Sequence, residues 1–480
     1  MQLNSPQPLL VRHRFALASI SIPLLIRLIP EIIAGPYPIG YDTITAYVPA
    51  MRDWAAGNTA AQFDPAVGGW LIFVLFGSLY GATRIDPLTI LKVAAPMLYG
   101  LLGLSEYFFS RKMLGWGSSR SAFLVLVAST YFVSLRISWD LIRNLLGLVL
   151  MLPTLVVWKR AGSLREYALL SVLMLLVVAA HPLVGVLLCS IILLHALITR
   201  KSYWKHAIAA LPATAWCGVS LLGFSTQGTT ILASDSQTMD PLGTLAYPVY
   251  IFLPLIPVAI LGLARLRSTL LNIWIVVCGL GVLASITPLA VSTQLVEPER
   301  WSFMMFLPLV VLSIEGFFVL RNNGILTRRL GRTLAIGWLL VLVILGSTYM
   351  GLQAQMAFPY YSGFQPTSML QSTIPIQYSQ NMINQFVWLS DNATEHAAII
   401  APNAIYGWAR EYFTGNTTIL GFPPNVTLQA MLQAALKDGY SRVYLVWWTV
   451  NKGWGNPADI PEGFVLEHSD GPFGGYIFSS

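Results

Sequence analysis

The sequence predicts an α-helical polytopic membrane protein of about 11 transmembrane helices with a small C-terminal α/β domain. Only 10% of the 480 residues are charged, whereas a soluble domain carries roughly a quarter. Hydrophobic residues make up 55% of the chain and gather in long runs separated by short basic clusters. A soluble fold cannot bury that much apolar surface, so lipid is the expected solvent for most of the chain.

The crossing helices are predicted from the lengths of the apolar runs. A helix needs about 20 apolar residues to cross the hydrocarbon core. The runs nearest this length are 15–34, 88–110, 121–135, 143–158, 167–180, 183–199, 207–224, 248–264, 270–288, 301–320 and 333–351. A twelfth stretch, 66–82, is short, begins near Gly68 and Gly69, and is flanked by acids. We interpret it as a re-entrant or interfacial helix inside a first outer loop, 35–87.

The positions of the basic residues predict the orientation. If 66–82 does not cross, more than half of the 28 Lys and Arg residues fall in cytoplasmic loops, as the positive-inside rule requires. They are Arg12, Arg14, Arg111, Lys112, Arg120, Lys159, Arg160, Arg165, Arg200, Lys201, Lys205, Arg265, Arg267, Arg321, Arg328, Arg329 and Arg332. The expected location is a plasma or ER-type membrane, with a cytoplasmic N-terminus, retained as a signal anchor, and an extracytoplasmic C-terminal region.

The chain divides into a membrane region, 1–351, and a polar region, 352–480. Short apolar runs at 397–400 and 443–446 predict strands, and 427–437 predicts a helix between them. Three Asn-x-Ser/Thr sequons begin at Asn392, Asn416 and Asn425, which agrees with an extracytoplasmic position. This region is therefore expected to form a small α/β domain.

The net charge of +7 does not indicate a nucleic-acid partner, because the basic residues lie in short loops between apolar runs. Membrane lipids are the expected partner. The three cysteines lie inside apolar runs without metal-ligand spacing. Acids, in contrast, collect in the loops assigned to the outside: Asp42, Asp53, Asp64, Asp86, Asp140, Asp235, Asp240, Glu297 and Glu299. Chemistry that needs carboxylates is therefore expected on the outer face.

Asp42 is the first candidate catalytic residue. It follows a stiff Pro/Gly-rich exit from the first span and lies beside Tyr41, a candidate acceptor-side residue of the same loop. A carboxylate there could act as a base toward a hydroxyl or an amide, or orient the acceptor. The alternative is that Asp42 only caps a helix over 43–54.

Asp140 is the second candidate, in a predicted loop over 134–144 that also holds Arg136 and Arg143. The arginines could neutralise an anionic headgroup while Asp140 binds an acceptor or a metal. Asp140 is thus a candidate ligand of a divalent cation, Mg²⁺ or Mn²⁺. The alternative is an interfacial ion pair that only anchors the loop.

Further candidates flank these two loops. Arg300 opens the tenth span and could hold a phosphate in its planar fork, or simply reach the interface. His181 lies in a tight turn before Pro182 and could touch the same headgroup, or be incidental. Asp235 and Asp240 belong to a Ser/Thr/Gly-rich loop that could act as a lid.

This layout resembles the GT-C superfamily of integral membrane glycosyltransferases, which includes oligosaccharyltransferase catalytic subunits, protein O-mannosyltransferases and aminoarabinose transferases. The resemblance rests on the acid early in the first outer loop (YDTITAYVPAMRDW), the acid after the third span (LRISWDLIRNLLGL), the interfacial helix and the C-terminal domain. It implies transfer of a sugar from a polyprenyl- or dolichyl-phosphate-linked donor to an acceptor on the outer face. Asp42 and Asp140 match the loop acids, and Arg300 matches a phosphate-side arginine. The resemblance implies that Asp42 is the base or, together with Asp140, a ligand of the divalent cation.

This chain differs from the oligosaccharyltransferase catalytic subunits in two motifs. Oligosaccharyltransferase subunits carry an acid directly after two tryptophans, whereas this chain reads Trp447-Trp448-Thr449, and we expect both tryptophans to continue the strand before them. Those subunits also have paired acids in the second outer loop, where this chain has Asp140 alone. A monosaccharide transferase therefore fits better than an enzyme that modifies sequon asparagines.

Three other classes stay open. A transporter or lipid-glycan flippase would place ionisable groups within the spans, where this chain has Arg27, Lys92, Glu106 and Glu315. A glycan polymerase or ligase would use the same face with a lipid-linked acceptor. A non-catalytic relative would keep the fold without the chemistry.

Overall fold

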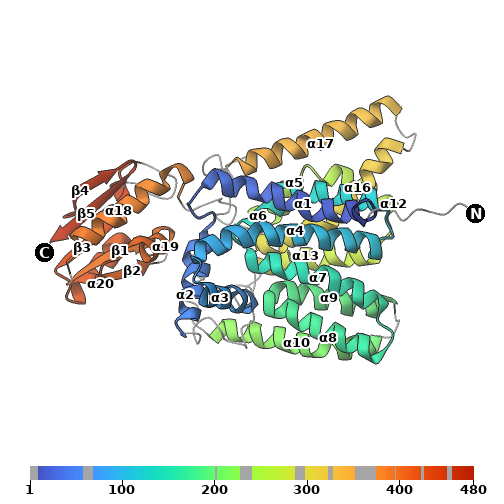
Figure 1. Cartoon of the computed structure of the whole chain (residues 1–480), viewed down its shortest axis with the longest axis horizontal. Helices are drawn as coiled ribbons and strands as arrows, with labels where there is room; N and C mark the ends of the chain where they lie inside the picture. The colour runs from blue at the N-terminus through green and yellow to red at the C-terminus, as the bar shows by residue number, and fades with distance from the viewer. Residues whose placement is uncertain are drawn as a thin grey trace, which may run out of the picture.

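The structure of the protein is a computed structural model, which describes residues 9–57, 69–199, 203–226, 241–286, 298–322, 328–351, 374–394, 396–422, 426–450 and 457–479. It is a helical polytopic membrane protein with a small sheet domain near its C-terminus (Figure 1). The predicted boundary at 351/352 adjoins residues 352–373, which lie outside these ranges. So do Asp235 and Asp240 of the expected lid.

Helices fall on each of the predicted crossing segments. The helices of the membrane region are α1 (Leu9–Ala34), η1 (Thr43–Tyr47), α2 (Val48–Ala55), α3 (Leu71–Thr83), α4 (Pro87–Met113), α5 (Ser118–Thr130), α6 (Phe132–Asp140), α7 (Ile142–Arg160), α8 (Leu164–Ala180), α9 (Pro182–Thr199), α10 (Tyr203–Thr226), α11 (Pro241–Phe252), α12 (Ile256–Arg265), α13 (Thr269–Ser285), α15 (Pro298–Met304), α16 (Phe306–Asn322) and α17 (Arg328–Met350). In Figure 1 they form an elongated bundle with the sheet domain at one end.

Not every one of these helices could cross a membrane alone. Six candidate spans in the described ranges are long and apolar enough, or eight if each of two bent helix pairs is one span. The number 11 therefore stays a prediction. Helix α3 has 13 residues, so it extends about 20 Å and is shorter than the hydrocarbon core. This length suits the interfacial position expected for 66–82.

The bend between α5 and α6 corrects one prediction. Tyr131 is extended, and the two helices meet at 68°. The stretch 134–144, expected to be a loop, is instead helical except at Leu141: residues 134–140 belong to α6, and α7 begins at Ile142. All nine residues of α6 are buried. An ion pair between Arg136 and Asp140, four residues apart, stabilises this short helix. The bend turns Asp140 toward the end of the bundle near the sheet domain.

Close helix contacts in the bundle depend on small residues. Gly262 of α12 lies against the backbone of Leu312, and Gly316 of α16 lies against the backbone of Val258. A methyl group at either position would overlap a carbonyl, so only glycine permits this crossing. Such contacts are typical of helices that associate in lipid, where van der Waals packing replaces the hydrophobic effect.

The C-terminal domain is a five-stranded sheet in the order β2-β1-β3-β5-β4. Its strands are β1 (Ala397–Pro402), β2 (Thr418–Phe422), β3 (Arg442–Trp448), β4 (Val465–Asp470) and β5 (Phe473–Ser479), and its α-helices are α18 (Ser379–Asn392), α19 (Asn403–Tyr412) and α20 (Leu428–Lys437). Strand β1 is parallel to β2 and β3, whereas β5 is antiparallel to β3 and β4. The expected strands and helix are all present, and Trp447 and Trp448 continue β3 into the core as predicted.

The sheet domain contacts the segment that follows α1. Helix α19 packs on η1, where Gly407 lies against Thr45. Arg52 Nη2 forms an ion pair with Glu411 Oε1 at 2.6 Å. Ile44 of η1 is 2% exposed and belongs to the same buried apolar cluster as the sheet. The two parts of the chain therefore share a core immediately after Asp42.

Candidate functional site

The site forms where the chain leaves α1 and meets the end of α6. Gly40 has a φ of +83° and lies directly against the side chain of Asp140. Any side chain here would be strained and would overlap that carboxylate, so glycine is required. The close approach lets two successive N–H groups reach Asp140 Oδ2: that of Tyr41 donates at 2.8 Å and that of Asp42 at 3.4 Å.

Asp140 is fully engaged within the protein. Its side chain is 1% exposed, and Arg136 donates to its other oxygen, Oδ1. An ionised carboxylate in so buried a position is stable only with such partners. Asp140 therefore holds the segment 40–42 in place and presents little oxygen to a ligand.

Arg27 holds the helix that carries Asp140. Its Nε donates to the carbonyl of Ser138 at 3.1 Å, and its Nη2 donates to the carbonyl of Trp139 at 3.4 Å. These carbonyls end α6 and have no partner within the helix, so a cation there is favourable. Glu31 binds both Arg27 and Lys92, each at 2.8 Å. This buried cluster fixes α6 relative to α1 and α4.

The carboxylate of Asp42, in contrast with that of Asp140, has no bond that holds it within the described residues. Asp42 precedes η1, but its side chain makes no capping hydrogen bond, so the capping alternative is wrong. Within the described residues no hydrogen bond or ion pair engages its carboxylate, and the residue is half-buried. Burial, followed by the charge of Asp140, raises the pKa of Asp42 from 3.8 to about 6, although Arg300, Arg143 and Arg136 oppose this rise.

Five residues therefore define an acid–arginine cluster: Asp42, Asp140, Arg136, Arg143 and Arg300. With both acids ionised, two negative charges face three positive ones, a net charge of +1. Arg143, in the first turn of α7, is half-buried and lies 5.8 Å from the centre of the Phe73 ring. Its guanidinium has no carboxylate within ion-pair distance in the part of the chain described. Arginine in such a position suits a planar phosphate or carboxylate ligand.

His181 and Tyr47 border the cluster. Burial, with the charges of Arg143 and Arg300, lowers the pKa of His181 well below its ordinary value, so the ring is neutral. Its Nδ1 is buried without a hydrogen-bond partner among the residues described. Tyr47 Oη accepts from the N–H of Arg143 at 3.4 Å, and burial raises the pKa of Tyr47 to about 12. Tyr47 therefore keeps its proton at neutral pH.

The cluster suits an anion better than a divalent cation. One of the two expected metal ligands, Asp140, already binds Arg136 and two N–H groups. Three arginines also surround the remaining carboxylate, and their charge opposes a second cation.

The structure brings together Asp42, Asp140, Arg136, Arg143, Arg300 and His181, with Tyr41 beside them. Gly40, Tyr47 and the Arg27–Glu31–Lys92 cluster were not among the expected site residues. Arg27 and Glu31 are four residues apart in an apolar helix, a spacing that places them on one face and indicates a buried pair. No protein family matches this chain, and no curated protein is similar to it in sequence.

Proposed function

We propose that this protein is a glycosyltransferase that moves a sugar from a polyprenyl- or dolichyl-phosphate-linked donor to an acceptor hydroxyl. The proposal rests on one observation above all: a half-buried carboxylate, Asp42, without a hydrogen-bond partner in the described residues, lies among three arginines. A base next to a phosphate-binding group is what this transfer requires. The expected membrane embedding suits a lipid-linked donor.

The reaction follows from these residues. The acceptor oxygen attacks C1 of the sugar, and its proton passes to the Asp42 carboxylate. The bond between C1 and the phosphate oxygen breaks, and its electron pair leaves with the polyprenyl phosphate. Arg143 and Arg300 stabilise the negative charge that grows on this phosphate. Asp140 acts as a positioning residue that holds the backbone of Asp42.

The orientation of the chain supports access by such a donor. The basic clusters assign the opposite end of the bundle to the cytoplasm, so the acid–arginine cluster and the sheet domain would face outward. Lipid-linked sugars displayed on that face would reach Asp42 without a soluble nucleotide-sugar. No step of the proposed reaction needs a metal ion.

The decisive experiment measures sugar transfer by the full chain in lipid nanodiscs that contain a polyprenyl-phosphate sugar and a hydroxyl acceptor. Asp42→Asn should lower the rate by at least about 100-fold, the usual contribution of a general base. Arg143→Gln should weaken donor binding, whereas Asp438→Asn, an exposed acid of the sheet domain, should act as wild type. Unchanged transfer in Asp42→Asn would refute the proposal. Movement of the donor across the bilayer without transfer would favour the flippase alternative.

A further inference from the structure

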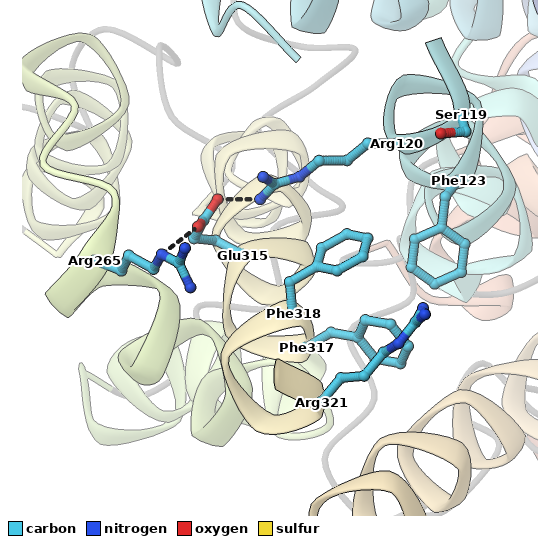
Figure 2. Close-up of a pocket in the computed structure, with 8 residues that line it drawn as sticks. All are labelled: Ser119, Arg120, Phe123, Arg265, Glu315, Phe317, Phe318 and Arg321. Carbon is cyan, nitrogen blue, oxygen red and sulfur yellow. Dashed lines mark hydrogen bonds and ion pairs between the residues drawn. The ribbon is translucent and has the colours of Figure 1, made fainter. Parts of the chain in front are cut away.

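A cavity of about 430 Å³ lies at the other end of the bundle, between α5, α12 and α16 (Figure 2). It is lined by Ser119, Arg120, Phe123, Arg265, Glu315, Phe317, Phe318 and Arg321. Its size falls within the range of small-ligand sites. Nothing in the proposed transfer reaction uses these residues.

The lining carries more positive than negative charge. Glu315, only 6% exposed, pairs with Arg120 and with Arg265, whose Nε lies 3.3 Å from Glu315 Oε1. Arg321 is exposed and forms no ion pair within the described part of the chain. Three arginines thus face one carboxylate, an excess of two positive charges. The Nε group of Arg120 is also a buried donor that has no acceptor among the described residues.

Aromatic rings hold Arg120 and form an apolar wall. The Arg120 guanidinium lies 4.0 Å from the ring centre of Trp116 and 4.7 Å from that of Phe318. Phe123 contacts Phe317 and Phe318, with ring centres 5.1 and 6.1 Å apart. Stacking fixes the plane of the guanidinium, so less entropy is lost when it binds an anion.

The cavity lies where lipid headgroups are expected. Arg300 and Arg321 are near the two ends of one candidate span, Glu299–Arg321. A helix of that length places them about 30 Å apart, close to the thickness of the hydrocarbon core. The cavity is therefore at the opposite membrane surface from the acid–arginine cluster. The basic clusters assign this surface to the cytoplasm, where anionic lipids concentrate.

We propose that this cavity binds the phosphate headgroup of an anionic phospholipid. Arg120, Arg265 and Arg321 would meet the phosphate, and the Phe123, Phe317 and Phe318 rings would contact the start of the acyl chains. A free phosphate ion offers the same charge but gains nothing from an aromatic wall. Basic pockets between transmembrane helices at this surface bind lipid headgroups for these reasons.

Lipid binding to the purified full chain in detergent tests the proposal, with native mass spectrometry as the measurement. Phosphatidylglycerol should bind in preference to phosphatidylcholine. Arg321→Gln should weaken phosphatidylglycerol binding about tenfold, the loss of one charge-assisted contact. Glu315→Gln should strengthen it, because the competing carboxylate is gone. Arg267→Gln removes an equal charge at an exposed site two residues beyond Arg265 and serves as the matched control.

Three outcomes would overturn the proposal. Equal losses in Arg321→Gln and Arg267→Gln would indicate general surface charge instead of a site. Phosphatidylcholine carries the same phosphate but also a cationic choline, so equal binding of phosphatidylglycerol and phosphatidylcholine would exclude the net negative charge of the headgroup as the cause. Displacement of the lipid by an equal concentration of inorganic phosphate would identify a free anion as the ligand. Because no sugar transfer is measured, failure here leaves the proposed transferase activity separately testable.

Discussion

At the scale of single residues, two aspartates in one cluster have different environments. Asp140 is buried and bound by Arg136 and two N–H groups, whereas the Asp42 carboxylate has no hydrogen bond within the described residues. Burial and like charge raise the pKa of a carboxyl, and a raised pKa makes it a better base near neutral pH. In the proposed transfer, Asp140 would therefore position the segment and Asp42 would accept the proton.

The pKa of Asp42 predicts the pH dependence of transfer. With a pKa of about 6, the carboxylate is ionised at neutral pH and protonated below pH 6. The rate should be constant above pH 7 and should fall about tenfold per pH unit below 6, because only the ionised form accepts a proton. A pH–rate profile measures this. A constant rate down to pH 4 would exclude Asp42 as the base.

The same pKa predicts a gain in stability when Asp42 is neutralised. Because the folded pKa exceeds the ordinary 3.8, the ionised form is disfavoured in the fold, and stability is lost as pH rises through about 6. Asp42→Asn should therefore stabilise the protein by about 1–3 kcal/mol at pH 7.5 and by little at pH 4. Thermal unfolding in detergent at both pH values tests this. An equal change at both pH values would point to packing as the cause.

At the scale of elements, the position of Asp140 depends on what holds the end of α6. Arg27 donates to the carbonyls of Ser138 and Trp139, while Glu31 ties Arg27 to Lys92. Arg27 contacts residues more than 110 positions further along the chain, and the helix bends locally at Tyr131. The lengths of apolar runs predict neither the contact nor the bend, which is why the sequence predicted a loop over 134–144.

Replacing Arg27 tests whether it is a positioning residue. Arg27→Met should lower the transfer rate about tenfold and shift the midpoint of the pH profile, because Asp140 would move relative to Asp42. Arg27→Lys keeps the positive charge, so its rate and its pH midpoint should lie between those of Arg27→Met and the wild type. Lys92→Met removes the other partner of Glu31 and should shift the midpoint less than Arg27→Met, because Arg27 itself donates to the carbonyls at the end of α6. If both variants shift it equally, Arg27 has no specific role.

The contact between α19 of the sheet domain and η1 predicts that a substitution in the sheet domain lowers the rate of transfer. A methyl group at Gly407 would already lie 2.7 Å from Thr45 Cγ2, so Gly407→Val should push η1 and displace Asp42. Transfer should fall about tenfold, since small misplacements of a catalytic group are costly. Gly337→Val, where no atom lies within 4 Å, is the matched control. Full activity of Gly407→Val would show that η1 tolerates the displacement.

At the scale of the whole molecule, the sequence predicted the class and most helix positions, because so many long apolar runs in one chain are compatible only with helices in lipid. It also identified Asp42, Asp140 and their arginines as candidates, since only 21 of the 480 residues are acidic and these two lie in segments assigned to the outer face. It could not reveal that Asp140 accepts hydrogen bonds from the backbone N–H groups of Tyr41 and Asp42. The close approach at Gly40 permits these bonds, and it joins residues about a hundred positions apart. Sidedness remains a prediction from the basic clusters.

Thiol labelling of intact cells that carry the chain in their plasma membrane tests that sidedness. The three native cysteines are buried, so they contribute little background. An impermeant maleimide should label Gln433→Cys in the sheet domain directly, and Arg165→Cys between α7 and α8 only after permeabilisation. Both positions are exposed. The reverse pattern would place Asp42 on the cytoplasmic face and remove the proposed access of an outer acceptor.

The insertion of Ile44 into the core of the sheet domain has a consequence for engineering. If residues 374–480 were replaced by a sheet domain from another protein, Ile44, two positions from Asp42, would pack against a different core. A chimera should therefore be active only when residues 43–47 and the sheet domain are taken from the same protein. Residues 43–47 and the sheet domain, more than 300 positions apart in the sequence, therefore belong to one structural unit.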